Sequence, residues 1–493
     1  MMSRHGRIDA NREKILNQPV LKTLITLGLP LMIVQLVNIS YNLADAFWLQ
    51  MYRDVEIAVP RQIFPTFMLI NAFAQGIVAA NTAIITQYIG AKMYDDAKQS
   101  VRYFVSFTVI SNVVLASIYF ALRPLIFTYI VRVPLEIYDP VMRYSGIITF
   151  DMIGSALTLT YSTILMSIGD SRTPAVVNAV AALTNVVLDP FLILGFNVKT
   201  PFGFEIAFPP MGATGAAAAT VASRFVGVLA LLRFLSTKYP FLKTSLTLNI
   251  SRDWIKTTLR AGMPVTILMS TNSLAFMLQN SLINSFGVKT TAAASIGFLI
   301  MDLADAVLWG FTSSVAVLVG QSLGAGLYER AKSVALKSSL FIGSASAVGS
   351  LLAWVFRAQI ISVFTQDPEI AYKAEEFVNI FISSLPFFAV FMVGMSVGRG
   401  SGHTTSMSII AAIRLWAVRI FLAYLLAFYT GMGERGIWVA MALSNYVGGV
   451  FMLGWMWMGN WNKPIIKTSP GRVGAVFTGR PLLSSEGKND NQG

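Results

Sequence analysis

The chain has 493 residues, of which 55% are hydrophobic and only 12% charged, and its formal net charge is +13. A soluble domain carries about 25% charged residues, so this composition excludes a soluble fold and places most of the chain in lipid. The absence of cysteine excludes disulfides and thiol sites. The positive charge is better explained by loops held in the cytoplasm than by nucleic-acid binding.

The apolar segments are about 20–25 residues long, which is the length that spans a bilayer as a helix, and they lack the period-two alternation of barrel strands. After a polar N-terminal tail at 1–19, we predict twelve spanning helices. Their predicted ranges are 20–50, 58–90, 101–124, 143–168, 174–197 and 212–235, then 254–286, 290–322, 333–356, 374–398, 406–428 and 436–459. A linker at 237–250 separates a first lobe (20–236) from a second lobe (251–460), and the polar tail at 461–493 is predicted to be disordered.

Lysine and arginine are concentrated in the two tails and in the even-numbered loops. Because cytoplasmic loops carry the excess of positive residues, we expect both termini in the cytoplasm of a multi-pass protein in the cell membrane. An even number of spans agrees with this orientation.

The two halves of the chain repeat one another at an offset of 234 residues (321 − 87). Gln87, Gly90 and Tyr94 reappear as Gln321, Gly324 and Tyr328, and Gly28, Pro30 and Gly76 reappear as Gly262, Pro264 and Gly310. An internal repeat of this kind defines the architecture. Two parallel membrane halves with a cavity between them are a transporter arrangement.

The first predicted helix carries an acid at membrane depth. Asp45 lies about 30 Å above the cytoplasmic entry of this helix, and Gln35, Asn38 and Asn42 share its face because the spacings are three, four and three residues. An ionisable residue in a membrane span is by default a functional candidate. Two readings of Pro30, lower in this helix, stay open: a hinge or an inert kink.

The fifth predicted helix carries a matching stripe of Asn178, Asn185 and Asp189, with Asp189 about 23 Å above its start. Asn185 lies one turn below Asp189, and Thr214 at the outer start of the next helix offers another oxygen. Carboxylate, amide and hydroxyl oxygens suit Na⁺ or a proton and not zinc. The alternative is that Asp45 and Asp189 only lock helices together by hydrogen bonds.

The second half does not repeat these acids, since Gln279 stands where the repeat would place Asp45. It carries Asp302 and Asp305 instead. Two interpretations stay open: they line the cavity and attract cations, or Arg414 or Arg419 satisfies them across the bundle. Asp151 is equally ambiguous. Aromatic side chains near the first-half acids, including Tyr41 and Tyr144, would suit an amphiphilic cation.

With these residues in place, the chain resembles the multidrug and toxin extrusion (MATE) transporters, in their DinF-like branch with its archaeal members, over residues 15–460. The resemblance rests on Gly28-Leu-Pro30, Tyr41-Asn42-Leu-Ala-Asp45, Gln87-Tyr-Ile-Gly90-Ala91, Gly169-Asp170-Ser-Arg172-Thr173-Pro174, Asn185-Val-Val-Leu-Asp189-Pro190, Arg399-Gly400-Ser-Gly402-His403-Thr404 and Arg414-Leu-Trp416-Ala-Val-Arg419. The chain departs from the pattern at His403, which replaces an acid, and at Phe421, where the family often has proline.

The resemblance implies an all-α polytopic membrane protein with twelve transmembrane helices in two pseudo-symmetric six-helix lobes around a central cleft. It implies alternating access, with export of cationic or amphipathic compounds driven by inward H⁺ or Na⁺ and no other cofactor. Asp45, Asn185 and Asp189 resemble the first-lobe cation site, with Pro30 as the bend in the first helix. It also implies a working monomer whose partners are small organic substrates and the bilayer.

Three other functions are weighed against this expectation. A lipid or lipid-linked oligosaccharide flippase of the same superfamily usually has more basic residues in its cavity, whereas Arg224, Arg414 and Arg419 are expected towards helix ends. An integral membrane enzyme lacks a site, because the only histidines are His5 in the tail and His403 in a loop. A channel is less consistent with acids in one half of a pseudo-twofold repeat.

Overall fold

The computed structural model describes residues 6–52, 56, 58–131, 133, 135–199, 205–243 and 245–466. Within these ranges the side chains of residues 38–46, 50, 58, 61, 65, 197–199, 205–207, 288, 299 and 300 are not described. Twelve helices of the described chain are long and apolar enough to cross a membrane. This confirms the predicted number of spans and the all-α membrane fold.

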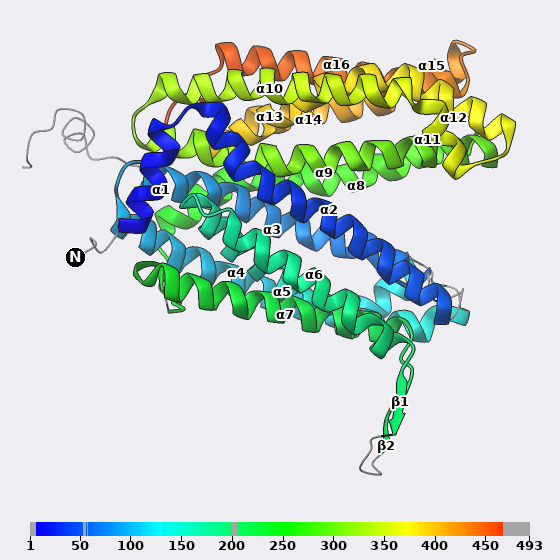
Figure 1. The fold of residues 1–493 in the computed structure, drawn as a ribbon, viewed down its shortest axis with the longest axis horizontal. Coiled ribbons are helices and arrows are strands. Elements are labelled where there is room, and N and C mark those ends of the chain that lie inside the picture. Colours follow the sequence, from blue (N-terminus) through cyan, green and yellow to red (C-terminus); the bar gives the residue numbers. More distant parts are fainter. Residues whose placement is uncertain are drawn as a thin grey trace, which may run out of the picture.

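Six of these helices form a first bundle, drawn blue to green in Figure 1. They are α2 (Val20–Tyr52), α3 (Ala58–Gly90), α4 (Tyr94–Leu125), α5 (Leu135–Ser167), α6 (Arg172–Ile193) and α7 (Ala213–Lys238). A π-helical turn, η2 (Ile126–Ile130), extends α4, and a 3₁₀ turn, η3 (Pro240–Leu242), follows α7. Several of these helices exceed the roughly 20 residues that a bilayer needs, so they protrude or tilt.

The remaining six spans form a second bundle, drawn green to red in Figure 1. It holds α8 (Arg252–Asn284), α9 (Val288–Gly324), α10 (Tyr328–Val355), α11 (Arg357–Phe364), α12 (Pro368–Phe381), α13 (Leu385–Ser401), α14 (Thr404–Ala412), α15 (Leu422–Tyr429) and α16 (Glu434–Met458). The 3₁₀ turn η4 (Ile382–Ser384) joins α12 to α13 in one span, and the π-helical segment η5 (Ile413–Phe421) joins α14 to α15 in another. At the start of α12, Asp367 caps the backbone N–H groups of Glu369 and Ile370.

The two bundles meet along a pair of long helix crossings. Helix α3 of the first bundle packs against α8 of the second, and α2 packs against α9. Where α3 crosses α8, a Cβ atom on Gly76 or on Gly262 would come within 2.7 Å of the other glycine's carbonyl oxygen. Two glycines are therefore what lets these backbones approach so closely.

The bundles lie together at the end that carries α1 (Gly6–Asn17), and their ribbons diverge towards the opposite end (Figure 1). A core of buried apolar side chains spans both bundles, with Ile15 and Leu24 beside Leu318 and Val319. A further core, around Phe104 of the first bundle, also includes Trp254 at the start of α8, and another lies within the second bundle around Phe377. The molecule is thus held together at one end and built from separate cores elsewhere.

Three parts of the described structure differ from the expectations. Residues 6–17, expected as tail, form helix α1, in which Ile8, Arg12 and Ile15 are buried. Trp461–Ile466, expected as the start of a disordered tail, pack against the bundles, and Trp461 is 1% exposed; residues 467–493 lie outside the described structure. A hairpin of β1 (Phe196–Lys199) and β2 (Glu205–Phe208), unforeseen from the sequence, projects from the bundle end where the ribbons diverge (Figure 1).

Candidate functional site

The buried acid of α6 lies beside an amide, as the spacing predicted. Asp189 is 0% exposed and Asn185 is 1% exposed. The Nδ2 atom of Asn185 donates a hydrogen bond of 3.3 Å to Oδ1 of Asp189. Asp189 lies about 26 Å along α6 from Arg172 at 1.5 Å per residue, so the pair is within the membrane span.

Helix α6 packs against α2, the helix that carries the other predicted half of this site. The backbone of α2 is helical throughout, including Pro30. The side chains of Asn38, Tyr41, Asn42 and Asp45 lie outside the described residues, so the predicted approach of Asp45 to Asp189 is not tested. The remaining first-lobe candidates are half-buried: Gln35, Tyr144, Asn178 and Thr214.

Asp151 joins two helices of the first lobe through an ion pair. Its Oδ1 atom accepts a 3.0 Å hydrogen bond from Nε of Arg224, and its side chain is 2% exposed. The pair joins α5 to α7, which pack against one another. Because the carboxylate is matched by a guanidinium, we assign Asp151 to packing within the first lobe.

The second lobe has a polar centre built from α9, η5 and α16. Arg414 Nη1 and Arg419 Nη2 both donate to Oδ1 of Asn445, at 2.9 and 3.0 Å. Asp305 lies near enough for both arginine charges to act on it. Even so, among the described residues neither Asp302 nor Asp305 forms an ion pair with an arginine. The Oδ1 atom of Asp305 is buried without a partner.

The position of these arginines corrects one expectation. Arg414 and Arg419 lie about 15 and 22 Å along a span that starts at Thr404. Arg224 lies about 17 Å from the start of α7 at Ala213. All three are therefore in the middle of their spans and not near helix ends, so their position no longer argues against a lipid substrate.

The two bundles lie together at the end that carries α1, which we call the closed end (Figure 1). There the two lobes exchange hydrogen bonds symmetrically. Gln87, at the end of α3, donates from Nε2 to the carbonyl oxygen of Ser401 at 3.0 Å. Gln321, at the end of α9, donates from Nε2 to the carbonyl oxygen of Ser167 at 2.7 Å. Each donor and each acceptor is the repeat counterpart of the other, 234 residues away (321 − 87 and 401 − 167), and each bond crosses between the lobes.

Gly90 and Gly324 allow this approach. A Cβ atom on Gly90 would overlap the backbone of Gln321, and one on Gly324 would overlap the backbone of Gln87. The segment after α16 adds to the closure, because the backbone N–H of Ile465 donates to Oε1 of Gln87 at 2.8 Å.

Helix α1 bridges both lobes at the same end. Arg12, 4% exposed, donates to the carbonyl oxygen of Gly90 from Nε at 2.9 Å and from Nη2 at 2.8 Å. From the second lobe, Arg330 donates to the carbonyl oxygens of Ile15 at 2.5 Å and of Gln18 at 2.8 Å. These are carbonyls at the C-terminal end of α1, which have no partner within the helix.

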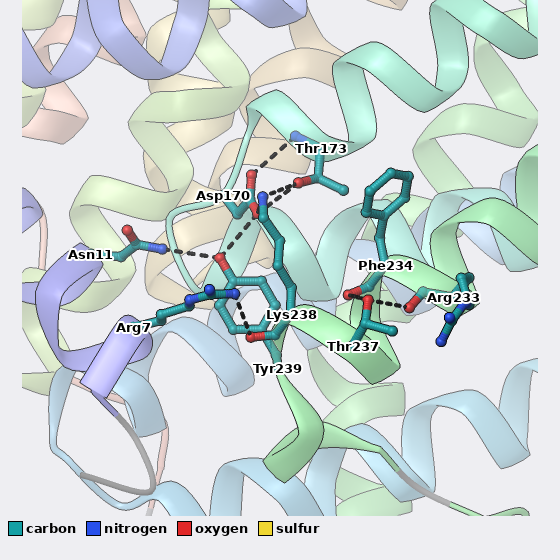
Figure 2. A network of polar contacts seen from close by, with 9 residues as sticks. All are labelled: Arg7, Asn11, Asp170, Thr173, Arg233, Phe234, Thr237, Lys238 and Tyr239. Carbon is teal, nitrogen blue, oxygen red and sulfur yellow. Dashed lines mark hydrogen bonds and ion pairs between the residues drawn. The ribbon is translucent and has the colours of Figure 1, made fainter. Parts of the chain in front are cut away.

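A charged network anchors α1 to the first lobe, as Figure 2 shows. Asp170, in the turn between α5 and α6, accepts from the backbone N–H of Thr173 at 3.0 Å and from its hydroxyl at 2.7 Å. Lys238 Nζ and the Tyr239 hydroxyl both donate to Oδ2 of Asp170 at 3.0 Å. Asn11 of α1 donates to the Tyr239 hydroxyl at 3.3 Å.

Burial alone would raise the pKa of Asp170, but the hydrogen bonds from Thr173 and Lys238 hold it below the ordinary value for an aspartate. Burial and the charge of Asp170 raise the pKa of Tyr239. The corresponding loop of the second lobe has His403 instead of an acid, and burial lowers its pKa. The network is therefore confined to the first lobe.

Sequence reasoning identified Gln87 and Gln321 as part of the repeat, and Gln87 also as part of a motif of the family resemblance, but gave neither a role, and it missed α1 altogether. A glutamine retained at the same place in both halves was a usable signal, because a buried amide needs partners. Helix α1 gave little signal, since most of its residues are polar and only one face is buried.

Comparison with known proteins places this geometry in a family. The family model described as MatE matches residues 30–191 and 264–425. The chain belongs to the MatE family. The two matches start 234 residues apart (264 − 30), so each lobe is one copy of the MatE unit.

Individual proteins that are similar to this chain agree with the family membership. "Probable multidrug resistance protein YoeA" of Bacillus subtilis (strain 168) is 28% identical over 403 residues, covering 81% of this chain and 85% of that protein. "Probable multidrug resistance protein NorM" of Thermotoga maritima is 25% identical over 452 residues, covering 91% and 94%. A solved structure described as the outward-facing conformation of a multidrug resistance MATE family transporter of the MOP superfamily aligns with a TM-score of 0.81 at 22% identity, covering 90% of this chain and 97% of that chain.

The solved structure shows the two-lobe fold, and MatE membership makes the protein a multi-pass membrane transporter and not an enzyme. Within the described residues, His, Cys, Asp and Glu do not form a group of three that could hold a metal ion. Since the Asp45 side chain is outside those residues, the predicted Na⁺ site at Asp45, Asn185 and Asp189 stays a prediction.

Proposed function

We propose that this MatE protein is a secondary active multidrug exporter that exchanges H⁺ or Na⁺ for cationic or amphipathic organic compounds by alternating access. One observation carries the proposal: a carboxylate, Asp189, is fully buried inside a membrane span beside the amide of Asn185. Burying an ionisable group inside a membrane span is costly. Binding and release of a cation by Asp189 would explain why a carboxylate is buried there.

The coupling site consists of Asp45 and Asp189 with Asn185 and Thr214. Loading a cation from outside neutralises the carboxylates and weakens the binding of a cationic substrate, which leaves outward. A ligand shifts a two-state equilibrium only through its differential affinity for the two states, and neutralisation of buried acids provides that difference. The substrate cavity comprises Gln35, Asn38, Tyr41, Asn42, Tyr144, Asn178, Asp302 and Asp305.

Alternating access requires the closed end of the lobes to open. The bonds of Gln87 and Gln321 hold this end shut, while Pro30 in α2 acts as the hinge that follows the state of Asp45. With both termini in the cytoplasm of the cell membrane, the closed end faces inward. The transporter works as a monomer, since each molecule contains both lobes.

A second candidate function, flipping of lipids or lipid-linked oligosaccharides, is favoured by Arg414 and Arg419, which are buried in mid-span. Anionic headgroups would find positive charge there. The first candidate is preferred because two relatives that cover 81% and 91% of the chain are named as probable multidrug resistance proteins.

The test is efflux of a fluorescent organic cation from proteoliposomes under a pH gradient or a Na⁺ gradient. Wild type is compared with Asp189→Asn and Asp45→Asn, and with Asp139→Asn as control, an aspartate whose side chain is 73% exposed. We expect at least a tenfold loss of gradient-driven efflux for the first two variants and none for the control. Efflux that is unchanged in Asp189→Asn and Asp45→Asn would refute the coupling site, and the effective gradient identifies the ion.

A further inference from the structure

The strongest unexplained feature is a pair of arginines buried in the middle of the second lobe. Arg414 is 8% exposed and Arg419 is 2% exposed, and both donate to the same oxygen, Oδ1 of Asn445. Sharing one acceptor brings two like charges together in a low-dielectric region. That arrangement is costly unless negative charge compensates for it.

The described residues compensate for it only in part. The acids on helix α9 are Asp302, which is exposed, and Asp305, which is half-buried. Neither forms an ion pair with an arginine among the ion pairs of the described residues. With Asp305 ionised, two guanidinium groups still face one carboxylate, so this buried centre carries excess positive charge.

The arginines also have unused donors. Two guanidinium groups have about ten N–H bonds, of which one is used by Arg414 towards Asn445 and two by Arg419 towards Ser444 and Asn445. The Nε atom of Arg414 is buried without a partner. The hydrogen bonds of the described residues do not involve Nη2 of Arg414 or Nη1 of Arg419. The pair therefore keeps unused N–H donors beside the oxygen of Asn445 that it shares.

Aromatic rings line one side of the pair. The guanidinium of Arg414 lies 4.3 Å from the ring centroid of Phe391 and 5.4 Å from that of Phe388, both on α13. Helix α9, which carries the two acids, also packs against α2 and α3 of the other lobe. Positive charge, free N–H donors and apolar rings are thus placed together next to the helix that forms the lobe interface.

We propose that Arg414 and Arg419 form a binding subsite for the anionic group, a carboxylate or a phosphate, of an amphipathic organic molecule. The planar guanidinium forks match the two oxygens of such a group, and Phe388 and Phe391 contact its apolar part. That this molecule is a transported substrate rests on the proposed transport function. The lobes then divide the charges: the first lobe takes cations at its acids, and the second takes the anionic group of an anion or a zwitterion.

The test measures equilibrium binding, so it does not depend on a gradient or on transport. Two fluorescent probes share a xanthene ring system and differ in charge: carboxyfluorescein is anionic and rhodamine 6G is cationic. Fluorescence polarisation gives the affinity of each for the purified protein. We expect Arg414→Gln and Arg419→Gln to weaken carboxyfluorescein binding at least tenfold and to leave rhodamine 6G binding within about twofold of wild type.

Asp305→Asn is the variant of opposite sign. Neutralising the carboxylate on which both arginine charges act should strengthen carboxyfluorescein binding several-fold. Asparagine has nearly the same shape as aspartate, so this variant should fold. Arg143→Gln, whose side chain is 69% exposed, is the matched control for loss of one positive charge. If an Arg→Gln variant fails to fold, Arg414→Lys, which keeps the charge without the fork, and Asp305→Asn decide the question.

Three results would overturn the subsite: wild type that does not bind carboxyfluorescein, arginine variants that weaken both probes equally, or Asp305→Asn that leaves anion binding unchanged. The source of the anionic group is separated by repeating the measurement in nanodiscs of phosphatidylcholine with and without phosphatidylglycerol. Displacement of the probe by phosphatidylglycerol supports the subsite with a lipid headgroup as occupant. Retention in both supports the subsite with a soluble organic anion.

Discussion

Asp170 shows how one side chain can fix the geometry of a loop. Its two oxygens accept four hydrogen bonds, from the backbone and hydroxyl of Thr173, from Lys238 and from Tyr239 (Figure 2). These partners come from α6, from the end of α7 and from the residue that follows it. A nearly buried carboxylate with this many donors holds its charge, so the turn between α5 and α6 is tied to α7.

We predict that Asp170→Asn lowers the stability of the protein at neutral pH by about 1–3 kcal/mol, the usual effect of losing charged hydrogen bonds in a buried place. Because the folded-state pKa of Asp170 lies below the unfolded value of about 3.9, this contribution is fully present above that value. It is lost as the pH falls through the lower folded pKa. The difference in melting temperature between wild type and variant should therefore shrink below about pH 4.

The measurement is thermal unfolding of both proteins in detergent between pH 3 and pH 7.5. Asp139→Asn removes an aspartate in an exposed ion pair with Arg143 and should change stability by less than about 1 kcal/mol at any pH. A constant difference between wild type and Asp170→Asn across this range would contradict the assigned role of the charge.

At the scale of helices, composition and periodicity predicted most of what the structure contains. All twelve spans follow from apolar runs whose length matches a bilayer, and the stripe of Asn185 and Asp189 follows from helical spacing. The sequence could not predict α1 or the packing of Trp461–Ile466, because their few apolar residues become informative only when the lobe ends exist to bury them. Likewise, the pairing of Arg414 and Arg419 through Asn445 depends on η5 meeting α16.

The crossing of α2 and α9 depends on a glycine in each helix. A Cβ atom on Gly28 would come within 2.6 Å of the Phe311 ring, and one on Gly310 would overlap the backbone of Met32. By contrast, a Cβ atom on Gly349, six residues before the end of α10 (355 − 349), would meet no other atom within 4 Å. The same substitution should therefore have opposite effects in α9 and α10.

We predict that Gly310→Ala destabilises the protein by about 1–3 kcal/mol, since overpacking against a backbone forces the helices apart. Gly349→Ala should instead stabilise it by about 0.4–1 kcal/mol, because alanine restricts the unfolded chain and fits the helix. Melting temperatures of the two variants in the same detergent give the signs directly. Two shifts of the same sign would refute the tight crossing of α2 and α9.

At the scale of the whole molecule, the repeat gives the closure a reciprocal form. Gln87 of the first lobe reaches the end of α13, and Gln321 of the second reaches the end of α5. Each lobe therefore contributes the same donor and the same acceptor. Helix α1 and the segment ending at Ile466 also form hydrogen bonds at this end, and neither is part of the repeat. They therefore add asymmetric contacts to the symmetric contact of the two glutamines.

We predict that Gln321→Leu and Gln87→Leu move the lobes towards an arrangement that is open at this end. Leucine keeps much of the side-chain volume but removes the amide, and the loss of about 1 kcal/mol per hydrogen bond shifts a two-state equilibrium about fivefold. The effect of Gln87→Leu should be larger, because Gln87 also accepts from Ile465. Gln359→Leu, at an exposed position in α11, should have no effect.

The chain has no cysteine, so spin labels at Asp95→Cys and Glu329→Cys report a single distance without background. These positions are exposed, lie in the first turns of α4 and α10, and are repeat counterparts. Double electron–electron resonance should show a longer-distance population in both Gln→Leu variants and an unchanged distribution in Gln359→Leu. If the distance distribution of Gln87→Leu matches wild type, the crossed glutamines do not hold the lobes together, and closure must depend on α1 and the apolar core shared by the lobes.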